Sequence, residues 1–477
     1  MKNKFKIFTI VLFSIPVLVY AVPEKPPGSS NSSGSPSYKG ATTFSSSVVE
    51  ESKSYSSTQS SQNALLVSGG VSTIKNPSVT KSGDSDGDNA DFYGTNAAVL
   101  TYNNSTLNIE GGTITTNGSH ANAVFAYGTG IINISNTKIN TTSNNSGGIM
   151  VTGGGTLTAN SCTVKTTGNS SASIRSDRGG GTLTVNGGTY ETNGVGSPAI
   201  YSTANIIVND ADLISTSSEG LVVEGANSIE INNTKVKDTN NSLNGNSETY
   251  KNVFLYQSMS GDAENGTASF KAKNSTLITN KGDTIFVTNT TATIELENNT
   301  ITNNDGDFLR IQTGKWGKSG SNGGNVTLNM SNQKVDGNII VDSISTLEMK
   351  LSNSVFNGSI NNENKAKNIN LTLSSDSVLS LTQDTYLDSL KNETEDNSNI
   401  YSNGEYKLFV DGKEVSINSK KYEEENEVTH AETKEKSTET VNESKDYIIY
   451  IALSLVLISI IILTSILIVN NKKRKVN

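Results

Sequence analysis

The stretch Leu107-Asn108-Ile109-Glu110-Gly111-Gly112-Thr113-Ile114 decides the fold, because its pattern recurs along most of the 477-residue chain. Apolar side chains stand at its first, third and eighth positions, and small or polar residues fill the corner between them. After a fainter copy at Ser72/Ile74/Val79, the frame returns at Ile132/Ile134/Ile139, Leu157/Ala159/Val164, Leu183/Val185/Tyr190, Ile206/Val208/Leu213, Ile229/Ile231/Val236, Phe270/Ala272/Leu277, Ile294/Leu296/Ile301, Leu328/Met330/Val335, Met349/Leu351/Phe356 and Leu371/Leu373/Val378.

The spacing of the frames predicts a β-solenoid. From Leu107 to Ile229, successive frames begin 23 to 26 residues apart. A repeat of this size buries its apolar face only by stacking on its neighbours. The period-two alternation, the β-branched residues and the Gly/Asn/Ser/Asp corners indicate strands rather than helices. We therefore expect an all-β fold, a single-stranded right-handed parallel β-helix of about 11–12 coils over residues 62–378.

Short strands between the frames supply a second column of core residues. Side chains alternate across a strand, so the third and fifth positions of each strand are expected to face outward. The apolar second positions, assigned to the core, are Val99, Val124, Ile149, Ile174, Ile200, Val222, Phe254, Ile285, Leu309 and Ile339. The outward third positions are Leu100, Phe125, Met150, Arg175, Tyr201, Val223, Leu255, Phe286, Arg310 and Ile340, and the fifth positions begin with Tyr102, Tyr127, Thr152 and Asp177.

The two ends of the chain carry the signals of an exported, membrane-anchored protein. Residues 1–21 combine early lysines with an apolar run and small residues at a cleavage site, as a secretory signal peptide does. Residues 447–469 contain no charge and are long enough to cross a bilayer as a helix. The basic tail 470–477 follows and is expected in the cytoplasm. We therefore expect a single-pass cell-membrane protein whose N-terminal region is extracellular.

Three further segments flank the solenoid. Residues 22–61 are rich in Ser, Gly and Pro and predict a flexible leader. Residues 379–422 are expected to cap the end of the solenoid, with a hairpin around Asp411-Gly412. Residues 423–446 are charged and nearly free of apolar side chains, which predicts a disordered stalk between the cap and the membrane span.

Composition excludes several classes of function. The net charge of −9, with no basic patch outside the tail, argues against nucleic acid as a partner. The chain has only two histidines, His120 and His430, so neither a Ser/His/Asp centre nor a Cys/His zinc site is expected. The single cysteine, Cys162, is interpreted as a small buried filler.

Parallel β-helices often cleave polysaccharides, and Arg175, Asp177 and Arg178 are the candidate catalytic residues for such a reaction. Hydrolysis of a glycosidic bond needs two carboxyl groups roughly 5 to 9.5 Å apart. The next acid assigned to the column of Asp177 is Asp342, six coils away or about 29 Å at about 4.8 Å per coil. We therefore interpret the three residues as a salt-bridged cluster. A lyase that uses Ca²⁺ and an arginine base is the open alternative.

Asp84, Asp86 and Asp88 stand at alternate positions, as carboxylates do in calcium loops. The segment lacks the later bidentate glutamate of an EF-hand. These three residues are the candidate metal ligands, and Ca²⁺ is the one cofactor that the sequence suggests.

The outward column is the candidate ligand-binding surface, because a large exposed apolar patch usually marks a site of binding. Trp316 is the only tryptophan and lies in the glycine-rich excursion 314–324. The predicted contacts to an extended glycan or a peptide are Tyr102, Phe125, Tyr127, Arg175, Asp177, Tyr201, Phe286, Arg310 and Trp316. In the alternative reading, the excursions 257–264 and 314–324 fold back and cover this column.

The chain resembles a family of bacterial cell-surface proteins, often described as adhesin-like, with pectin-lyase-like β-helix repeats. The segments that carry the resemblance are 91–99 (DFYGTNAAV), 176–182 (SDRGGGT), 256–263 (YQSMSGDA), 288–294 (TNTTATI) and 316–327 (WGKSGSNGGNVT). The resemblance implies an extracellular β-helix and an adhesin-like role, but no catalytic residues. The chain departs from wall-sorted adhesins in having no Leu-Pro-x-Thr-Gly signal, which implies a membrane anchor.

Three functions stay open from the sequence. The first is an adhesin-like surface protein that binds an extracellular polysaccharide or another surface ligand along the outward aromatic and arginine stripe. The second is a polysaccharide lyase or glycoside hydrolase, and the third is a purely structural surface spacer.

Overall fold

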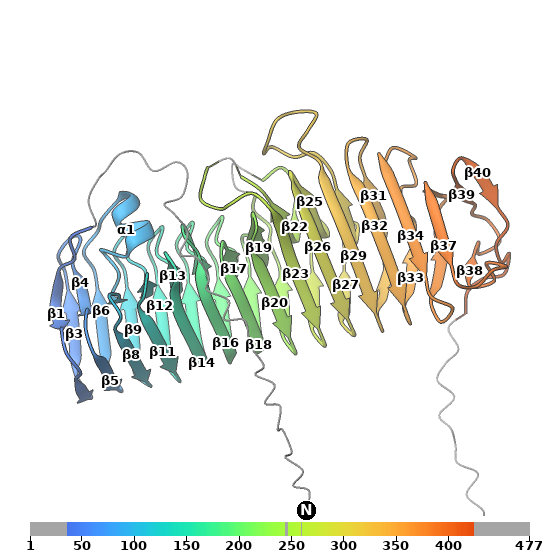
Figure 1. Ribbon diagram of the computed structural model, residues 1–477. Helices are drawn as coiled ribbons and strands as arrows, with labels where there is room; N and C mark the ends of the chain where they lie inside the picture. Colours follow the sequence, from blue (N-terminus) through green and yellow to red (C-terminus); the bar gives the residue numbers. More distant parts are fainter. Residues whose placement is uncertain (1–35, 244–246, 259, 424–477) are drawn as a thin grey trace, which may run out of the picture. The chain divides into compact units, whose positions relative to one another are not determined.

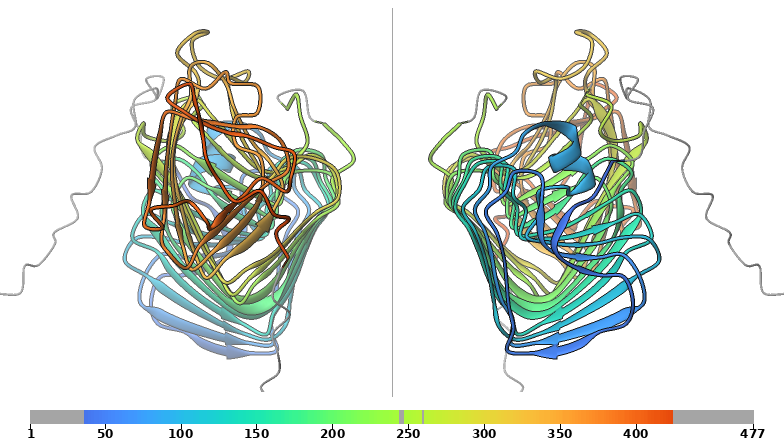
Figure 2. Two further views of the ribbon diagram at one scale, coloured as in Figure 1. Left: turned by 90° about the vertical axis from the view of Figure 1, so that its right-hand side faces the viewer. Right: turned by 90° about the vertical axis from the view of Figure 1, so that its left-hand side faces the viewer.

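A computed structural model of the chain describes residues 36–243, 247–258 and 260–423. These residues form a right-handed parallel β-solenoid of about 15 turns (Figure 1). Viewed along the stack, successive turns superpose around one core (Figure 2). The predicted all-β parallel β-helix is therefore confirmed.

The predicted signal peptide 1–21, span 447–469 and tail 470–477 lie outside the described residues, as does all but the first residue of the predicted stalk. Within the described part of the chain, no helix combines the length and the apolar character that a membrane crossing requires.

The first row of strands is a twelve-stranded sheet in which each strand pairs in parallel with the next. Its strands are β1 (Gly40–Phe44), β4 (Asn63–Val67), β7 (Val99–Thr101), β10 (Val124–Tyr127), β13 (Ile149–Thr152), β15 (Ile174–Ser176), β17 (Ile200–Ser202), β19 (Leu221–Glu224), β22 (Lys251–Tyr256), β25 (Asp283–Thr288), β28 (Leu309–Ile311) and β31 (Ile339–Val341).

The second row carries the beginning of each frame. Its strands are β2 (Val49–Glu51), β5 (Val71–Lys75), β8 (Thr106–Glu110), β11 (Ile131–Ser135), β14 (Gly155–Thr166), β16 (Gly181–Thr192), β18 (Asn205–Ser215), β20 (Ser228–Asn232), β23 (Thr267–Lys273), β26 (Thr290–Glu297), β29 (Gly324–Ser331), β32 (Thr346–Ser352), β34 (Asn368–Leu373) and β37 (Ser389–Asn392).

The third row carries the end of each frame, and the long strands β14, β16 and β18 serve both rows. Its other strands are β3 (Ser54–Ser57), β6 (Ser78–Lys81), β9 (Thr113–Thr116), β12 (Lys138–Thr141), β21 (Lys235–Asp238), β24 (Thr276–Thr279) and β27 (Thr300–Asn303), continued by β30 (Lys334–Asp336), β33 (Val355–Gly358), β35 (Val378–Leu381) and β38 (Ile400–Tyr401). A last small sheet holds β36 (Thr385–Leu387), β39 (Leu408–Val410) and β40 (Lys413–Val415).

The frame residues form the core in the way that the alternation predicts. Leu107, Ile109 and Ile114 are at most 1% exposed, and each pairs in register with the frame residue of the next coil. Each such side chain contributes on the order of 1.5 to 3 kcal/mol when it leaves water. Cys162 is a buried free cysteine in the same core.

The corners between the second and third rows explain the small and polar residues of the frame. Asn76, Asn136 and Asn233 have φ values of 47°, 52° and 48°, and Gly111 has a φ of 68°. This left-handed conformation turns the chain sharply, and glycine and asparagine adopt it at the lowest steric cost.

The short helix α1 (Gly87–Tyr93) lies on the outer side of the first row (Figure 1). It ends at Gly94, whose φ of 69° allows its N–H to donate to the carbonyl of Asn89. Ala90 is the buried residue of the helix. The helix is therefore a cover on the sheet rather than part of a coil.

The solenoid is longer than the frames predict. Strands β1, β2 and β3 form a first coil within residues 40–57, which the composition assigned to a flexible leader. Phe44 and Tyr55 are the buried apolar residues of this coil, and Val48 packs against them partly buried, so the apolar signal is weak. At the other end, β35 and β38 continue the parallel rows beyond residue 378, and the hairpin around Asp411-Gly412 is confirmed as the pair β39 and β40.

The register of two strands in the first row differs from the prediction by one residue. Leu221 pairs with Ile200 and with Val253, so Val223 and Leu255 point into the core, where both are fully buried. The core assignment of Val222 and Phe254 is therefore wrong, and both belong to the outward column. The frame spacing carries the correct signal, because Leu221 precedes Ile229 by eight residues, as Val99 precedes Leu107.

We expect the two faces of β18 to respond very differently to truncation. Ile206 is fully buried, whereas its neighbour Ile207 is 36% exposed. Ile206→Ala should lower the free energy of unfolding by about 2–5 kcal/mol, because it leaves a cavity in the core. Ile207→Ala should lower it by about 0.5 kcal/mol or less. Denaturant unfolding of both variants measures this, and equal losses would contradict the register.

Candidate functional site

A cleft of about 350 Å³ opens on the outer face of the first row, near the middle of the stack. Its floor is the outward column over four successive coils, formed by Arg175, Tyr201, Val222 and Phe254. These positions span three coil steps, or about 14 Å at about 4.8 Å per step. The cleft is therefore long enough for an extended ligand.

Loops supply the rest of the lining. Glu219 and Ser247 come from segments that precede strands of the first row, and Tyr256 ends β22. Trp316 comes from the excursion between β28 and β29, which rises on the same side of the stack as α1 (Figure 1). The long excursion thus brings the sole tryptophan back to a cleft whose floor ends at β22.

Three aromatic rings of the cleft, those of Trp316, Tyr256 and Phe254, form a continuous run that extends beyond the cleft to Phe286. The centroids of the Trp316 and Tyr256 rings are 5.7 Å apart, and Tyr256 stacks on Phe254 at 4.5 Å with an interplanar angle of 10°. Phe254 in turn lies 5.8 Å from Phe286. Such rings offer a broad apolar face together with polar edges.

The buried side chain of Glu224 is hydrogen-bonded to both tyrosines of the cleft. Its carboxylate is 1% exposed and accepts hydrogen bonds from the hydroxyls of Tyr201, Tyr256 and Ser258, the second at 2.8 Å. Burial, reinforced by the charge of Glu224, raises the pKa of Tyr256, which stays a donor. Hydrogen bonds to a charged acceptor are roughly twice as strong as neutral ones, so this carboxylate fixes both rings.

Arg175 lines the cleft, and its partner Asp177 lies behind it. The guanidinium donates to Asp177 Oδ2 at 2.8 Å and to the carbonyl of Ser170 at 3.2 Å. Asp177 is 2% exposed, and burial raises its pKa to about 6 even though Arg175 acts in the opposite direction. The pair confirms the predicted salt bridge between these two residues. The Nε–H of Arg175 is buried and has no partner among the described residues.

A second buried pair lies at the other end of the floor. Lys251 Nζ donates to Ser247 Oγ at 2.7 Å, lies 3.7 Å from Glu219 Oε1 and stands 4.6 Å from the centre of the Phe254 ring. Burial lowers the pKa of Lys251. Both charged groups that line the cleft, Arg175 and Glu219, thus have a partner of opposite charge. The cleft offers directed hydrogen bonds rather than a strong field of one sign.

Most of the predicted ligand-binding stripe is covered. Leu100, Phe125 and Met150 are fully buried beneath Tyr38, Tyr102 and Tyr127, while Leu255 faces the core and Phe286 is 4% exposed. The expectation that these residues face solvent is therefore wrong. The cover over the N-terminal half includes Tyr38 and α1, whose Tyr93 ring lies 5.4 Å from that of Tyr127. The predicted excursions contribute at their described residues: Asp262 pairs with Arg178, and Trp316 packs beside Tyr256 farther along the stack.

Arg178 clamps this cover and does not line the cleft. Its guanidinium pairs with Asp88 of α1 at 2.9 Å and with Asp262 at 2.5 Å, and it lies 3.8 Å above the ring of Phe92. Two segments far apart in the sequence are therefore held by one side chain.

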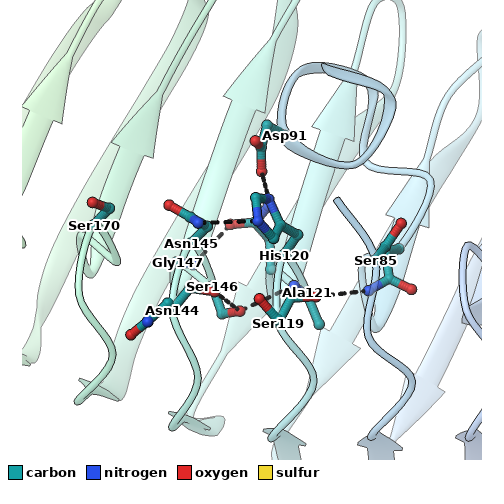
Figure 3. Close-up of polar contacts among 12 residues, drawn as sticks. Ser85, Asp91, Ser119, His120, Ala121, Asn144, Asn145, Ser146, Gly147 and Ser170 are labelled. Atoms are coloured by element: carbon teal, nitrogen blue, oxygen red, sulfur yellow. Dashed lines mark hydrogen bonds and ion pairs between the residues drawn. The ribbon is translucent and has the colours of Figure 1, made fainter. Parts of the chain in front are cut away.

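His120 holds the other side of α1 (Figure 3). Its Nδ1 lies 2.7 Å from Asp91 Oδ1, and its Nε2 lies 3.0 Å from Asn145 Nδ2. Both ring nitrogens are thus engaged by an acid and an amide, and no serine hydroxyl contacts the ring within residues 36–243. The arrangement docks the helix on the sheet.

The remaining predicted site residues are engaged elsewhere. Arg310 pairs with Asp283 at 2.8 Å and with Asp307, two coils beyond Phe254. Asp84 accepts a hydrogen bond from the amide of Ser119, and Asp88 pairs with Arg178. Calcium binding by Asp84, Asp86 and Asp88 stays a prediction from sequence. The residues that the structure describes contain no group of three or more His, Cys, Asp or Glu placed to hold a metal ion.

Of the predicted contacts, Arg175, Tyr201 and Trp316 come together in the cleft, and the sequence missed Glu219, Glu224, Phe254 and Tyr256. The omission of Glu224, Phe254 and Tyr256 follows from the register error, whereas Glu219 lies in the segment that precedes β19. Glu224 lies in the column of Asp177, only two coils away, or about 10 Å at about 4.8 Å per coil. The prediction that Asp342 is the next acid in this column is therefore wrong.

The comparisons found no protein-family model, no curated protein and no solved structure that matches the chain. The solenoid is consistent with pectin-lyase-like repeats. The adhesin-like assignment stays a prediction from sequence.

Asp238, at the end of β21, should make stability depend on pH. It is fully buried, its Oδ1 accepts from the amide of Asn240 at 2.7 Å, and its Oδ2 has no partner among the described residues. Burial, with a contribution from Glu219, raises its pKa to about 8. The folded state therefore holds this proton more tightly than the unfolded state, and stability falls as pH rises from about 4 to about 8.

We expect Asp238→Asn to remove this contribution and to be more stable than the parent at pH 8, with the advantage shrinking toward pH 4. Melting temperatures across this range measure it. The control is Asp212→Asn, which makes the same change of charge at an exposed position. A parallel pH dependence in parent and Asp238→Asn would show that Asp238 is not the responsible group.

Proposed function

We propose that this protein is an adhesin-like, membrane-anchored surface protein that binds a glycan in the cleft between Arg175 and Phe254. The observation that carries the proposal is the run of Trp316, Tyr256 and Phe254 beside hydrogen-bonding groups that are already held in place. A sugar ring presents C–H groups on its faces and hydroxyls on its edges, so it needs both kinds of surface at once.

The electrostatics of the cleft support a polyhydroxylated ligand. Arg175 and Glu219 are each neutralised by a buried partner, so neither demands a counterion from the ligand. Rings and polar groups that are fixed before binding lose little conformational entropy when the ligand arrives. The floor, about 14 Å long over three coil steps, accommodates a short run of sugar units.

The proposed location rests on the ends of the chain. The predicted signal peptide 1–21 and span 447–469 would hold the solenoid outside the cell membrane, with the basic tail 470–477 inside. The partner is then an extracellular polysaccharide or another glycan-bearing surface.

Polysaccharide cleavage is the second candidate, and the column of Asp177 and Glu224 favours it. Their spacing of about 10 Å along the stack is close to the carboxyl separation of inverting glycosidases. Neither acid lines the cleft, however, and both are bound to internal partners. Binding is therefore the function that the geometry supports best. Release of reducing or unsaturated ends by the parent, lost in Glu224→Gln, would establish cleavage instead.

We expect Trp316→Ala to weaken glycan binding by about tenfold or more without changing the fold, because stacking and burial of one aromatic ring are lost from an excursion outside the coils. The full-length chain in detergent is first screened on a glycan array, and the affinity for the strongest ligand is then measured by calorimetry for parent and variant.

Tyr386→Ala is the matched control, since it removes an aromatic ring that stacks on Phe409 far from the cleft. Equal affinities for Trp316→Ala and the parent would remove the cleft from the binding site. Absence of any glycan ligand would leave the structural spacer as the function.

A further inference from the structure

The excursion 314–324, which carries Trp316, is rich in glycine, so its conformation depends on specific contacts. Residues 314–324 contain five glycines, and Lys318, Ser319 and Gly320 are exposed. Glycine-rich segments lose more conformational entropy on ordering than others, so a stable position for Trp316 needs specific contacts.

Asn322 supplies those contacts from inside the excursion. Its side chain belongs to a residue only 4% exposed, and its Nδ2 donates to the carbonyls of Gly314 and Trp316, both at 2.9 Å. One amide group thus ties the end of the excursion to its beginning and to the backbone of the tryptophan itself.

The same residue fastens the excursion to the solenoid. The backbone carbonyl of Asn322 accepts from the amide of Asn289 at 3.0 Å and from Thr288 Oγ1 at 3.3 Å. Asn289 also donates its side-chain Nδ2 to the carbonyl of Gln257 at 2.7 Å. Gly317 packs directly on Asn289, since a Cβ there would lie 2.2 Å from Asn289 Oδ1.

We propose that Asn322 is the positioning residue of the glycan-binding cleft: it holds Trp316 beside Tyr256 before any ligand arrives. This inference rests on the proposed function for its effect on affinity. Its structural part stands alone, because the hydrogen bonds that fix Trp316 are made within the chain. Asn322 itself does not line the cleft.

The chain contains a single tryptophan, so intrinsic tryptophan fluorescence of the full-length chain reports on Trp316 alone. We expect Asn322→Ala to shift the emission to longer wavelength and to increase quenching by acrylamide, because the indole leaves its packed position. The melting temperature should stay within a few degrees of the parent, since the excursion lies outside the coils.

Binding gives the second readout. Affinity for the glycan found on the array should fall by about tenfold in Asn322→Ala. The double variant Asn322→Ala/Trp316→Ala should bind this glycan with the same affinity as Trp316→Ala alone. The matched control is Asn304→Ala, which removes an exposed amide bonded to Asn280 in the neighbouring coil. It should leave both readouts unchanged.

Gly317→Ala is an independent test of what holds Trp316 in place. The φ of 83° at Gly317 is unfavourable for alanine, and the added methyl group would clash with Asn289. This variant should reproduce the fluorescence change. Unchanged emission and quenching in both variants would overturn the inference. A clear fluorescence change with no glycan ligand found would leave the positioning role intact and reject only the proposed function.

Discussion

Every feature of this molecule depends on the parallel, in-register pairing of each coil with the next. Because Leu107 stacks on Ile132 and Ile132 on Leu157, one narrow apolar wall runs the length of the solenoid, and no coil can bury its share of it alone. A chain with only 33% hydrophobic residues can afford a core of this kind, since each coil needs only a few inward side chains. The left-handed asparagine and glycine corners keep the turns tight enough for the stack to continue.

The same pairing creates a problem on the outer face of the first row. Alternation along each strand sets one residue outward for every residue it buries, and several of these outward residues are large and apolar. Over the N-terminal coils, α1 and a group of tyrosines cover them, fastened by Arg178 and His120. Over the middle coils the cover stops, and the cleft occupies the uncovered part.

The cleft is lined by side chains that buried polar groups hold from behind. Glu224 gathers three hydroxyls, Asp177 anchors Arg175, and Lys251 lies close to Glu219. A buried charge is costly without partners, so such groups lose much of their freedom to move. Internal partners therefore hold several side chains of the cleft, and the loops, above all the excursion with Trp316, complete its lining.

The sequence by itself determined the architecture, because burial with period two and a repeat of 23 to 26 residues admits little besides a stacked β-coil. It also grouped Arg175, Tyr201 and Trp316 as one predicted surface, and these three residues line the same cleft. Only the tertiary structure decided where the stack begins, since the Ser/Thr-rich first coil is barely apolar, and which residues of β19 and β22 face outward. The tertiary structure also decided which outward residues are exposed. The cover over the N-terminal coils depends on contacts between segments distant in sequence, such as the ion pair of Asp88 and Arg178, ninety residues apart. Local alternation encodes the direction of a side chain, but long-range packing sets whether anything lies above it.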